Sequence, residues 1–279
     1  MDFATILVHL DGSRHLHQRV HLSAQLALAN GARLVGLFAT ARPDPNDIRG
    51  LMDGNRYLAS FNTWREQACR AARTAFEGAT SGVGIRTEWR ESEWGSQSGV
   101  LVASRLADLI VLGQTDATDR MASGDHQAVD EIILRCGRPV LVVPHTGSFP
   151  TIGQRVVVAW NGGGEAARAI RDALPILARA TSVKIVQCVA PDRWDDPWCS
   201  PGQYAVAWLH DHGIHATLSE TMLDNDTEAG ELLLSRLADS DADLLVMGAY
   251  GHARMREVVL GGVTRTLLRA MTAPVLLSH

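Results

Sequence analysis

Asp241-Ala242-Asp243-Leu244-Leu245-Val246-Met247-Gly248 is the stretch that decides the fold, because it repeats an earlier one, Leu106-Ala107-Asp108-Leu109-Ile110-Val111-Leu112-Gly113. The second copy lies 135 positions after the first (243 − 108), and a further matching pair, residues 138–143 and 273–278, keeps the same distance. The openings also match, residues 6–13 against 156–163. A repeat this long indicates two similar domains, not a solenoid. We expect them at residues 1–147 and 153–279, joined by the turn-rich stretch at 147–150.

Each half alternates apolar runs typical of buried strands with segments of helical periodicity. In the second half we expect strands at residues 155–160, 183–189, 214–218, 243–247 and 274–277, and helices from about 165 and over 203–212, 228–238 and 263–271. Pro175, inside the first of these helices, should kink it. The alternation predicts an α/β fold of two tandem Rossmann-like sandwich domains, each with a mainly parallel five-stranded sheet.

Composition narrows the function classes. The chain has 279 residues, of which 46% are hydrophobic and 20% charged, as expected for a globular protein. A net charge of −5 without a basic cluster argues against nucleic-acid binding. The apolar run at the start is too short for a signal peptide or a membrane span, and the four cysteines are scattered, so we expect a cytoplasmic protein with reduced thiols.

A glycine-rich loop in the second half has the character of a phosphate site. Gly248-Ala249-Tyr250-Gly251 follows a predicted strand, and Gly261-Gly262-Val263-Thr264 opens a predicted helix nine residues later. Glycines let backbone N–H groups approach an anion, and a helix N-terminus adds unpaired donors. The carboxyl end of a parallel strand is also where open α/β sheets bind ligands.

Charge separates the two copies of this loop. Between Gly248 and Arg265 three arginines and one glutamate give a net charge of +2. Between Gly113 and Glu131 one arginine and five acidic residues give −4, and Asp116 replaces Gly251. We therefore expect the first loop to repel a polyphosphate.

The whole chain resembles the tandem form of the universal stress protein family, whose adenine-nucleotide motif Gly-x2-Gly-x9-Gly-Ser/Thr stands here as Gly248-x2-Gly251-x9-Gly261-Gly262. The resemblance implies ATP or a related adenine nucleotide, with or without Mg²⁺, a regulatory role in stress response, final strands that meet within the chain, and a homodimer. It also implies the cofactor-binding residues Ala159, Trp160, Asn161, Cys188, Val189, Met247, Gly248, Gly251, Gly261, Gly262, Val263 and Thr264. Gly262 stands where the family has Ser or Thr, and Asn161 stands where it has an acid, and both departures weaken the predicted binding.

Other signals leave alternatives open. Gly162-Gly163-Gly164-Glu165-Ala166-Ala167 fits a loose dinucleotide fingerprint, which would suit an oxidoreductase. The loop with Trp194 and Trp198 suits a lid, a partner-binding patch or a tryptophan-pinned loop. The histidines at 210, 212 and 215 and at 17 and 21 look less like metal ligands than like surface side chains. No catalytic motif is found, so we expect a regulatory nucleotide-binding protein or, alternatively, an interaction protein that needs no nucleotide.

Overall fold

A computed structural model describes residues 2–40, 43, 48–49, 53–116, 118–119, 128–189, 201–222, 226–251 and 262–279. The predicted loop with Trp194 and Trp198, Gly261 and the nine residues before Gly261 lie outside the described residues. The chain divides into two compact units, one formed by Phe3–Cys136 and the other by Gly137–His279 with Asp2. The Phe3–Cys136 unit thus ends shortly before the fifth strand of the chain.

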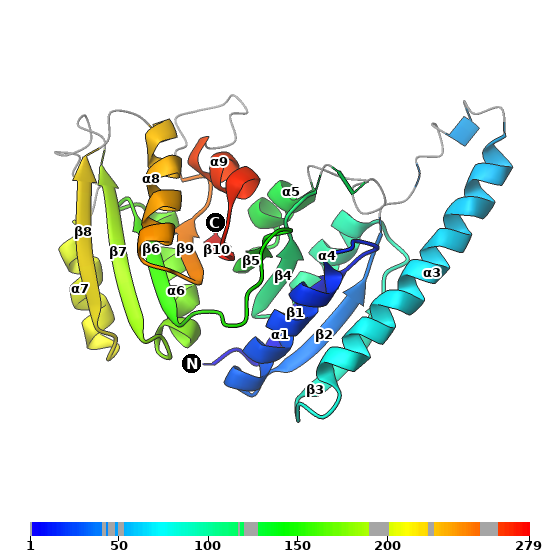
Figure 1. Cartoon of the computed structure of the whole chain (residues 1–279), viewed down its shortest axis with the longest axis horizontal. Coiled ribbons are helices and arrows are strands. Elements are labelled where there is room, and N and C mark those ends of the chain that lie inside the picture. Colours follow the sequence, from blue (N-terminus) through cyan, green and yellow to red (C-terminus); the bar gives the residue numbers. More distant parts are fainter. Residues whose placement is uncertain are drawn as a thin grey trace. The chain divides into compact units, whose positions relative to one another are not determined.

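The Phe3–Cys136 unit contains four parallel strands in the order β3-β2-β1-β4 (Figure 1). The strands are β1 (Thr5–Leu10), β2 (Arg33–Phe38), β3 (Arg86–Glu91) and β4 (Leu109–Gly113). Helix α1 (Leu16–Asn30) packs against α3 (Gly54–Thr80), and α4 (Ser96–Ser104) packs against α5 (Ala128–Arg135). The central strands β1 and β4 are buried over most of their length, as expected for a sheet covered on both faces.

The second unit contains six strands in the order β5-β10-β9-β6-β7-β8. They are β5 (Val140–Val143), β6 (Arg155–Trp160), β7 (Ser182–Val189), β8 (Ala216–Met222), β9 (Leu244–Gly248) and β10 (Val275–Ser278). Among the described strands of this unit, only the β5–β10 pair is antiparallel. The helices are α6 (Gly164–Leu177), α7 (Gly202–Asp211), α8 (Asp226–Asp239) and α9 (Gly262–Ala270), with α8 packed against α9. In Figure 1, α8 and α9 lie in front of this sheet and α7 behind it.

The repeated aspartates perform the same structural task in both units. Asp108 Oδ2 accepts the backbone N–H groups of Ala4 and Thr5, at 2.8 and 2.9 Å. Asp243 does the same for Gln154 and Arg155, at 3.1 and 2.9 Å. The aspartate before β4 therefore fixes the start of β1, and the aspartate before β9 fixes the start of β6. These bonds satisfy backbone donors that the neighbouring strand leaves unpaired, which explains why the sequence repeats an acid at this position.

The structure confirms the predicted α/β fold and places its strands more finely than the sequence did. The two final strands meet, since Leu276 of β10 faces Leu141 of β5 in an antiparallel pair, so β5 belongs to the same unit as β10. Strand β8 begins two residues later than expected and continues to Met222, because residues 216–222 pair with β7 along its whole length. Pro175 lies in the last turn of α6, near the end of the helix.

No helix in the described part of the chain is long and apolar enough to cross a membrane.

Candidate nucleotide site

The predicted loop begins where β9 meets the first turn of α6. Strands β6 and β9 are parallel neighbours in register, so their carboxyl ends meet at one edge of the sheet. Gly248, the last residue of β9, lies so close to α6 that an added side-chain carbon would come within 2.6 Å of the backbone N of Ala166. Only glycine fits there without moving the helix, which places the amino end of α6 against the start of the loop.

The end of the chain holds the next two residues of the loop. The N–H of Ala249 donates to the carbonyl of Ser278 (2.8 Å), and Nδ1 of His279 donates to the carbonyl of Ala249 (3.0 Å). The rings of Tyr250 and His279 meet edge to face, with centroids 6.3 Å apart. Tyr250 has a positive φ of 58°, a costly conformation for this residue that turns the chain sharply before Gly251. His279 is a residue of this site that the sequence argument missed.

Glu165 faces the second glycine of the loop. A side-chain carbon added at Gly251 would lie 2.8 Å from Oε2 of Glu165, and one added at Gly163 would lie 3.4 Å from the same oxygen. Glu165 is half-buried in the first turn of α6, where the helix dipole stabilises a negative charge. The sequence argument did not place Glu165 beside this loop. The spacing between Glu165 and Gly251 gave no hint of their contact.

Helix α9 begins beside the loop with Gly262, Val263 and Thr264. Gly262 is exposed, and an added side-chain carbon would meet no atom within 4 Å. Thr264 is buried, and its Oγ1 lies 3.4 Å from the backbone N of Tyr250. The Thr264 hydroxyl thus links α9 to the loop, and the exposed backbone of the first turn of α9 is the part open to a ligand.

Strands β6 and β7 supply the other predicted residues. Trp160 is buried at the end of β6, and Ala159 before it is half-buried. Trp160 lies in register with Gln187 of β7, and Oε1 of this buried glutamine accepts the N–H of Gly202 at the start of α7 (2.6 Å). Cys188 and Val189 follow at the end of β7, and their side chains lie outside the described residues. Met247 is buried in β9.

Asn161 folds back onto its own turn. Its Oδ1 accepts the N–H of Gly163 at 3.0 Å, just as Oδ1 of Asp11 accepts the N–H of Ser13 at 3.0 Å in the first unit. Asn161 thus replaces the acid in its local structural role. The same bond uses one of the N–H groups that a dinucleotide pyrophosphate would need from the Gly162–Gly164 turn.

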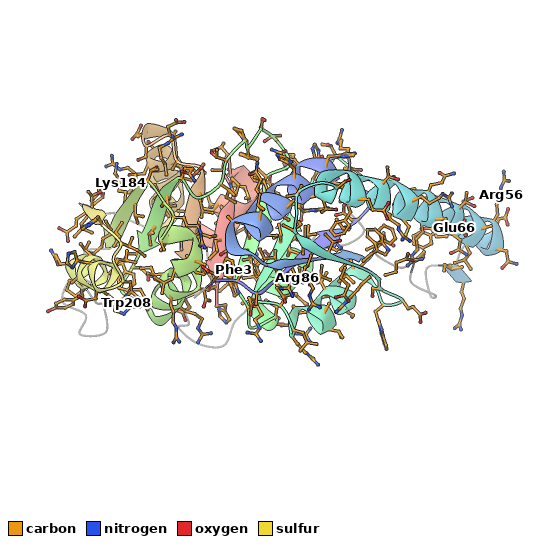
Figure 2. The ribbon with its side chains drawn as sticks, turned by 90° about the horizontal axis from the view of Figure 1, so that it is seen from below. Phe3, Arg56, Glu66, Arg86, Lys184 and Trp208 are labelled. Carbon is orange, nitrogen blue, oxygen red and sulfur yellow. The ribbon has the colours of Figure 1, made fainter. Side chains whose placement is uncertain are left out.

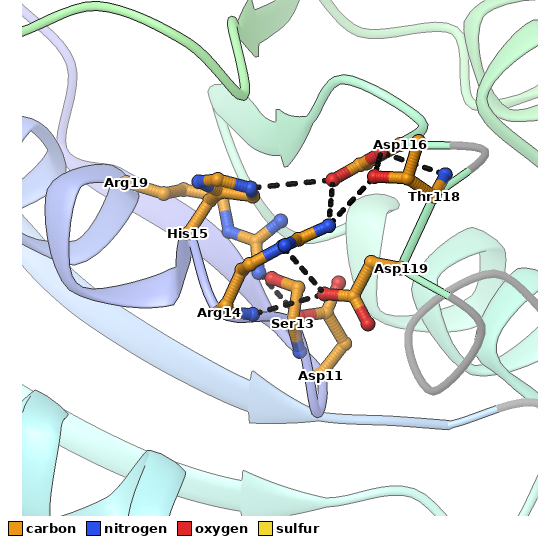
Figure 3. A network of polar contacts seen from close by, with 8 residues as sticks. All are labelled: Asp11, Ser13, Arg14, His15, Arg19, Asp116, Thr118 and Asp119. Atoms are coloured by element: carbon orange, nitrogen blue, oxygen red, sulfur yellow. Dashed lines mark hydrogen bonds and ion pairs between the residues drawn. The ribbon is translucent and has the colours of Figure 1, made fainter.

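The corresponding edge of the first unit is filled by charged side chains (Figure 3). Arg19, only 4% exposed, donates to Oδ1 of Asp11 at 2.7 Å and lies against Gly113, the counterpart of Gly248. Asp116, the counterpart of Gly251, accepts from Nη2 of Arg14 at 2.9 Å and lies 3.3 Å from Nε2 of His15. Asp116 of the acidic loop therefore has its charged partners within its own unit. These side chains occupy the place that corresponds to the predicted phosphate site of the second unit.

The charges of this network hold its carboxylates ionised. Burial alone would raise the pKa of Asp11, but the charges of Arg19 and His9 and the hydrogen bonds from Arg19 and Ser13 lower it well below its ordinary value. The hydrogen bonds from the side chain and backbone of Thr118, followed by those from Arg14 and His15, lower the pKa of Asp116. Burial lowers the pKa of His9, whose Nε2 donates to the carbonyl of Ala39 at 2.8 Å.

Comparison with known proteins agrees with this architecture. Residues 215–279 match the model of the universal stress protein family. Universal stress protein Slr1230 of Synechocystis sp. (strain ATCC 27184 / PCC 6803 / Kazusa) is 28% identical over 170 residues, which cover 61% of this chain and 57% of that relative. Sequence similarity to the universal stress protein family is thus found over residues 215–279.

Solved structures extend the likeness in fold to both units of the chain. A universal stress protein from Archaeoglobus fulgidus DSM 4304 superposes with a TM-score of 0.72 at 16% identity, covering 98% of this chain and 95% of that one. A functionally unknown protein from Pseudomonas aeruginosa PAO1 gives 0.59 at 14% identity, covering 99% and 92%. The two α/β halves of the present chain and its length of 279 residues fit the tandem form of the universal stress protein family.

The histidines at 210, 212 and 215 contact neighbouring side chains and backbone. The ring of His212 lies against Trp208, with centroids 4.0 Å apart, and its Nδ1 donates to the Trp208 carbonyl. His210 meets His215 edge to face. His17 and His21 are exposed on α1. In the described part of the chain, no group of three or more histidine, cysteine or acidic side chains is arranged to hold a metal ion. Figure 2 shows Trp208 on α7. This residue is 37% exposed.

Proposed function

We propose that this protein binds ATP, or a related adenine nucleotide, in its second unit and acts as a regulatory protein in stress response. Gly248, Gly251 and the first turn of α9 would hold the phosphates, and the ends of β6 and β7 would hold the nucleoside. In this proposal the protein is cytoplasmic and homodimeric, and it is not a catalyst.

One observation carries the proposal: the two copies of the same sheet edge differ in what occupies them. In the first, Arg14 pairs with Asp116 and Arg19 pairs with Asp11, and these side chains fill the edge. In the second, glycine stands at the position of Asp116, and the exposed start of α9 lies beside it. A glycine backbone next to a helix N-terminus offers N–H donors to an anion, so the second edge suits a phosphate group.

The two rival functions have less support. For an oxidoreductase that uses a dinucleotide, the N–H of Gly163 is already bonded to Asn161, and Gln187 near the end of β7 is not the acid that a ribose would require. For an interaction protein that needs no nucleotide, a glycine loop this close to α6 would serve packing alone. That second rival is the one that experiment must exclude.

A direct experiment is to denature the purified protein and analyse the supernatant by ion-exchange chromatography with detection near 260 nm. We expect an adenine nucleotide, or calorimetric binding of added ATP if the protein purifies empty. Release of NAD would support the oxidoreductase instead. If no nucleotide is released and millimolar ATP produces no binding heat, the proposal fails.

The Gly251→Asp variant tests the location of the site. It copies Asp116 of the first unit and puts a second carboxylate against Glu165, so we expect ATP binding to be lost. The matched control is Gly78→Asp on α3, where an added side-chain carbon meets no atom within 4 Å. Unchanged affinity in Gly251→Asp would show that the nucleotide binds elsewhere.

A further inference from the structure

Glu165 occupies an unusual position for a carboxylate in a site that would bind phosphates. Its Oε2 lies against the backbone of Gly251 and near that of Gly163, so the side chain points into the glycine loop. Among the described residues Glu165 has no hydrogen-bond or ion-pair partner. The negative charge is thus directed at the place where a second negative charge would have to bind.

The first unit shows what this helix position does when a partner is present. His15 occupies the position of Glu165, and its Nε2 lies 3.3 Å from Asp116, the counterpart of Gly251. In both units, therefore, a side chain at the amino end of the helix reaches the second position of the loop. In the first unit a basic side chain meets an acidic one. In the second unit the acidic side chain of Glu165 lies beside the backbone of Gly251.

The electrostatic consequence depends on what accompanies the ligand. A carboxylate a few ångströms from a phosphate repels it, and partial burial strengthens the repulsion. A divalent cation reverses the sign, because Mg²⁺ binds carboxylate and phosphate oxygens together and keeps several of its own waters. With Glu165 beside it, the backbone at Gly251 therefore fits a nucleotide that carries a divalent cation better than one that does not.

We infer that Glu165 is a selectivity residue that makes nucleotide binding in the second unit dependent on a divalent cation. The inference rests on the proposed function and adds a rule to it: the ligand is the Mg²⁺ complex of the nucleotide, and the metal-free nucleotide is rejected. Glu165 supplies the protein's carboxylate toward the cation, directly or through one of the ion's waters.

The test is calorimetric titration of ATP into the whole protein, once with excess Mg²⁺ and once with EDTA, for the native chain and for Glu165→Gln. Glutamine keeps the size and removes the charge. We expect the native chain to bind ATP at least about tenfold more tightly with Mg²⁺ than without it. In Glu165→Gln most of this difference should vanish, chiefly because metal-free ATP binds more tightly. Glu231→Gln, on an exposed position of α8, is the matched control and should retain the native dependence.

The outcomes separate the two proposals. Equal affinity with and without Mg²⁺ in the native chain, or an unchanged Mg²⁺ dependence in Glu165→Gln, overturns the inference and leaves the proposed function standing. A Glu165→Gln variant that binds more weakly by the same factor in both conditions also overturns it, since Glu165 would then act through a partner in the protein. No binding by either protein in either condition overturns the proposed function and this inference with it.

Discussion

Arg19 and Asp11 form an ion pair inside the first unit, with the two side chains only 4% and 15% exposed. Such a pair is expensive to break, because removing one member leaves the other charge buried without compensation. The energy that a ligand would supply at this edge thus comes from the protein itself. The first copy has an internal ion pair at the edge where we propose the binding site of the second copy.

Arg19→Met should therefore lower the free energy of unfolding by about 3–5 kcal/mol, measured by urea denaturation. The matched control is Arg179→Met, which removes a surface pair with Asp2 in which both side chains are well exposed. It should change the unfolding curve little. A loss for Arg19→Met no larger than for the control would mean that the buried pair contributes nothing to stability.

The same pair has a pH signature. The pKa of Asp11 is lower in the folded protein than its ordinary value of 3.8, so folding favours the ionised carboxylate. Its contribution is complete above that value and is lost as the pH falls through the folded pKa. We expect the stability difference between the native chain and Asp11→Asn to be constant near neutral pH and to shrink below about pH 4. A difference that stays constant into acid would contradict the assignment.

At the residue scale, sequence reasoning predicted the loop but not its surroundings. The glycines at 248 and 251 and the acid at 116 could be identified because each alters a repeated pattern at a fixed offset. Glu165 and His279 could not, because their roles come from contacts between segments 86 and 30 residues apart in sequence. No local periodicity records such a contact. Pairing of the acidic first loop with Arg14 was missed for the same reason.

At the scale of elements, the strand–helix contact at Gly248 sets the position of α6. A methyl group there would lie within 2.6 Å of backbone atoms of Glu165 and Ala166, which cannot rotate away as a side chain can. Gly248→Ala should therefore shift α6 and destabilise the protein by about 1–3 kcal/mol. Thermal and urea unfolding would measure the loss.

Gly262→Ala is the control for that prediction, because Gly262 is exposed and an added carbon meets no atom within 4 Å. It should be close to neutral. Similar losses in both variants would indicate that α6 yields easily to the added carbon.

Helices and strands were predicted well because their signals are local. The helix bounds differ by one or two residues from those expected, and strands β6, β7, β9 and β10 by at most one. Strand β8 was predicted less well, since its extent is set by the length of its neighbour β7 and not by its own polar, weakly patterned sequence. The membership of β5 also depends on pairing with a strand more than a hundred residues away, Val275–Ser278.

At the scale of the whole molecule, the two units differ at the carboxyl ends of corresponding strands: the first has a network of charged side chains there, and the second has a glycine loop. If nucleotide binds only where glycine replaces the charged network, calorimetry should give about one ATP per chain, not two. The Gly251→Asp chain should bind none. A ratio near two would show that the ion pairs of the first copy open to admit a ligand, and would contradict their role as a permanent filling.

The aspartates at 108 and 243 explain how the two copies can differ at this edge and still keep the same fold. Each ties together the amino ends of two strands, whereas the charged network and the glycine loop lie at the carboxyl ends of those same strands. Mutations at one end of the sheet therefore leave the fastening at the other end intact. After a duplication, this separation of the two roles to opposite ends of the strands would let one copy lose its ligand and still fold. The other copy would remain under selection for binding.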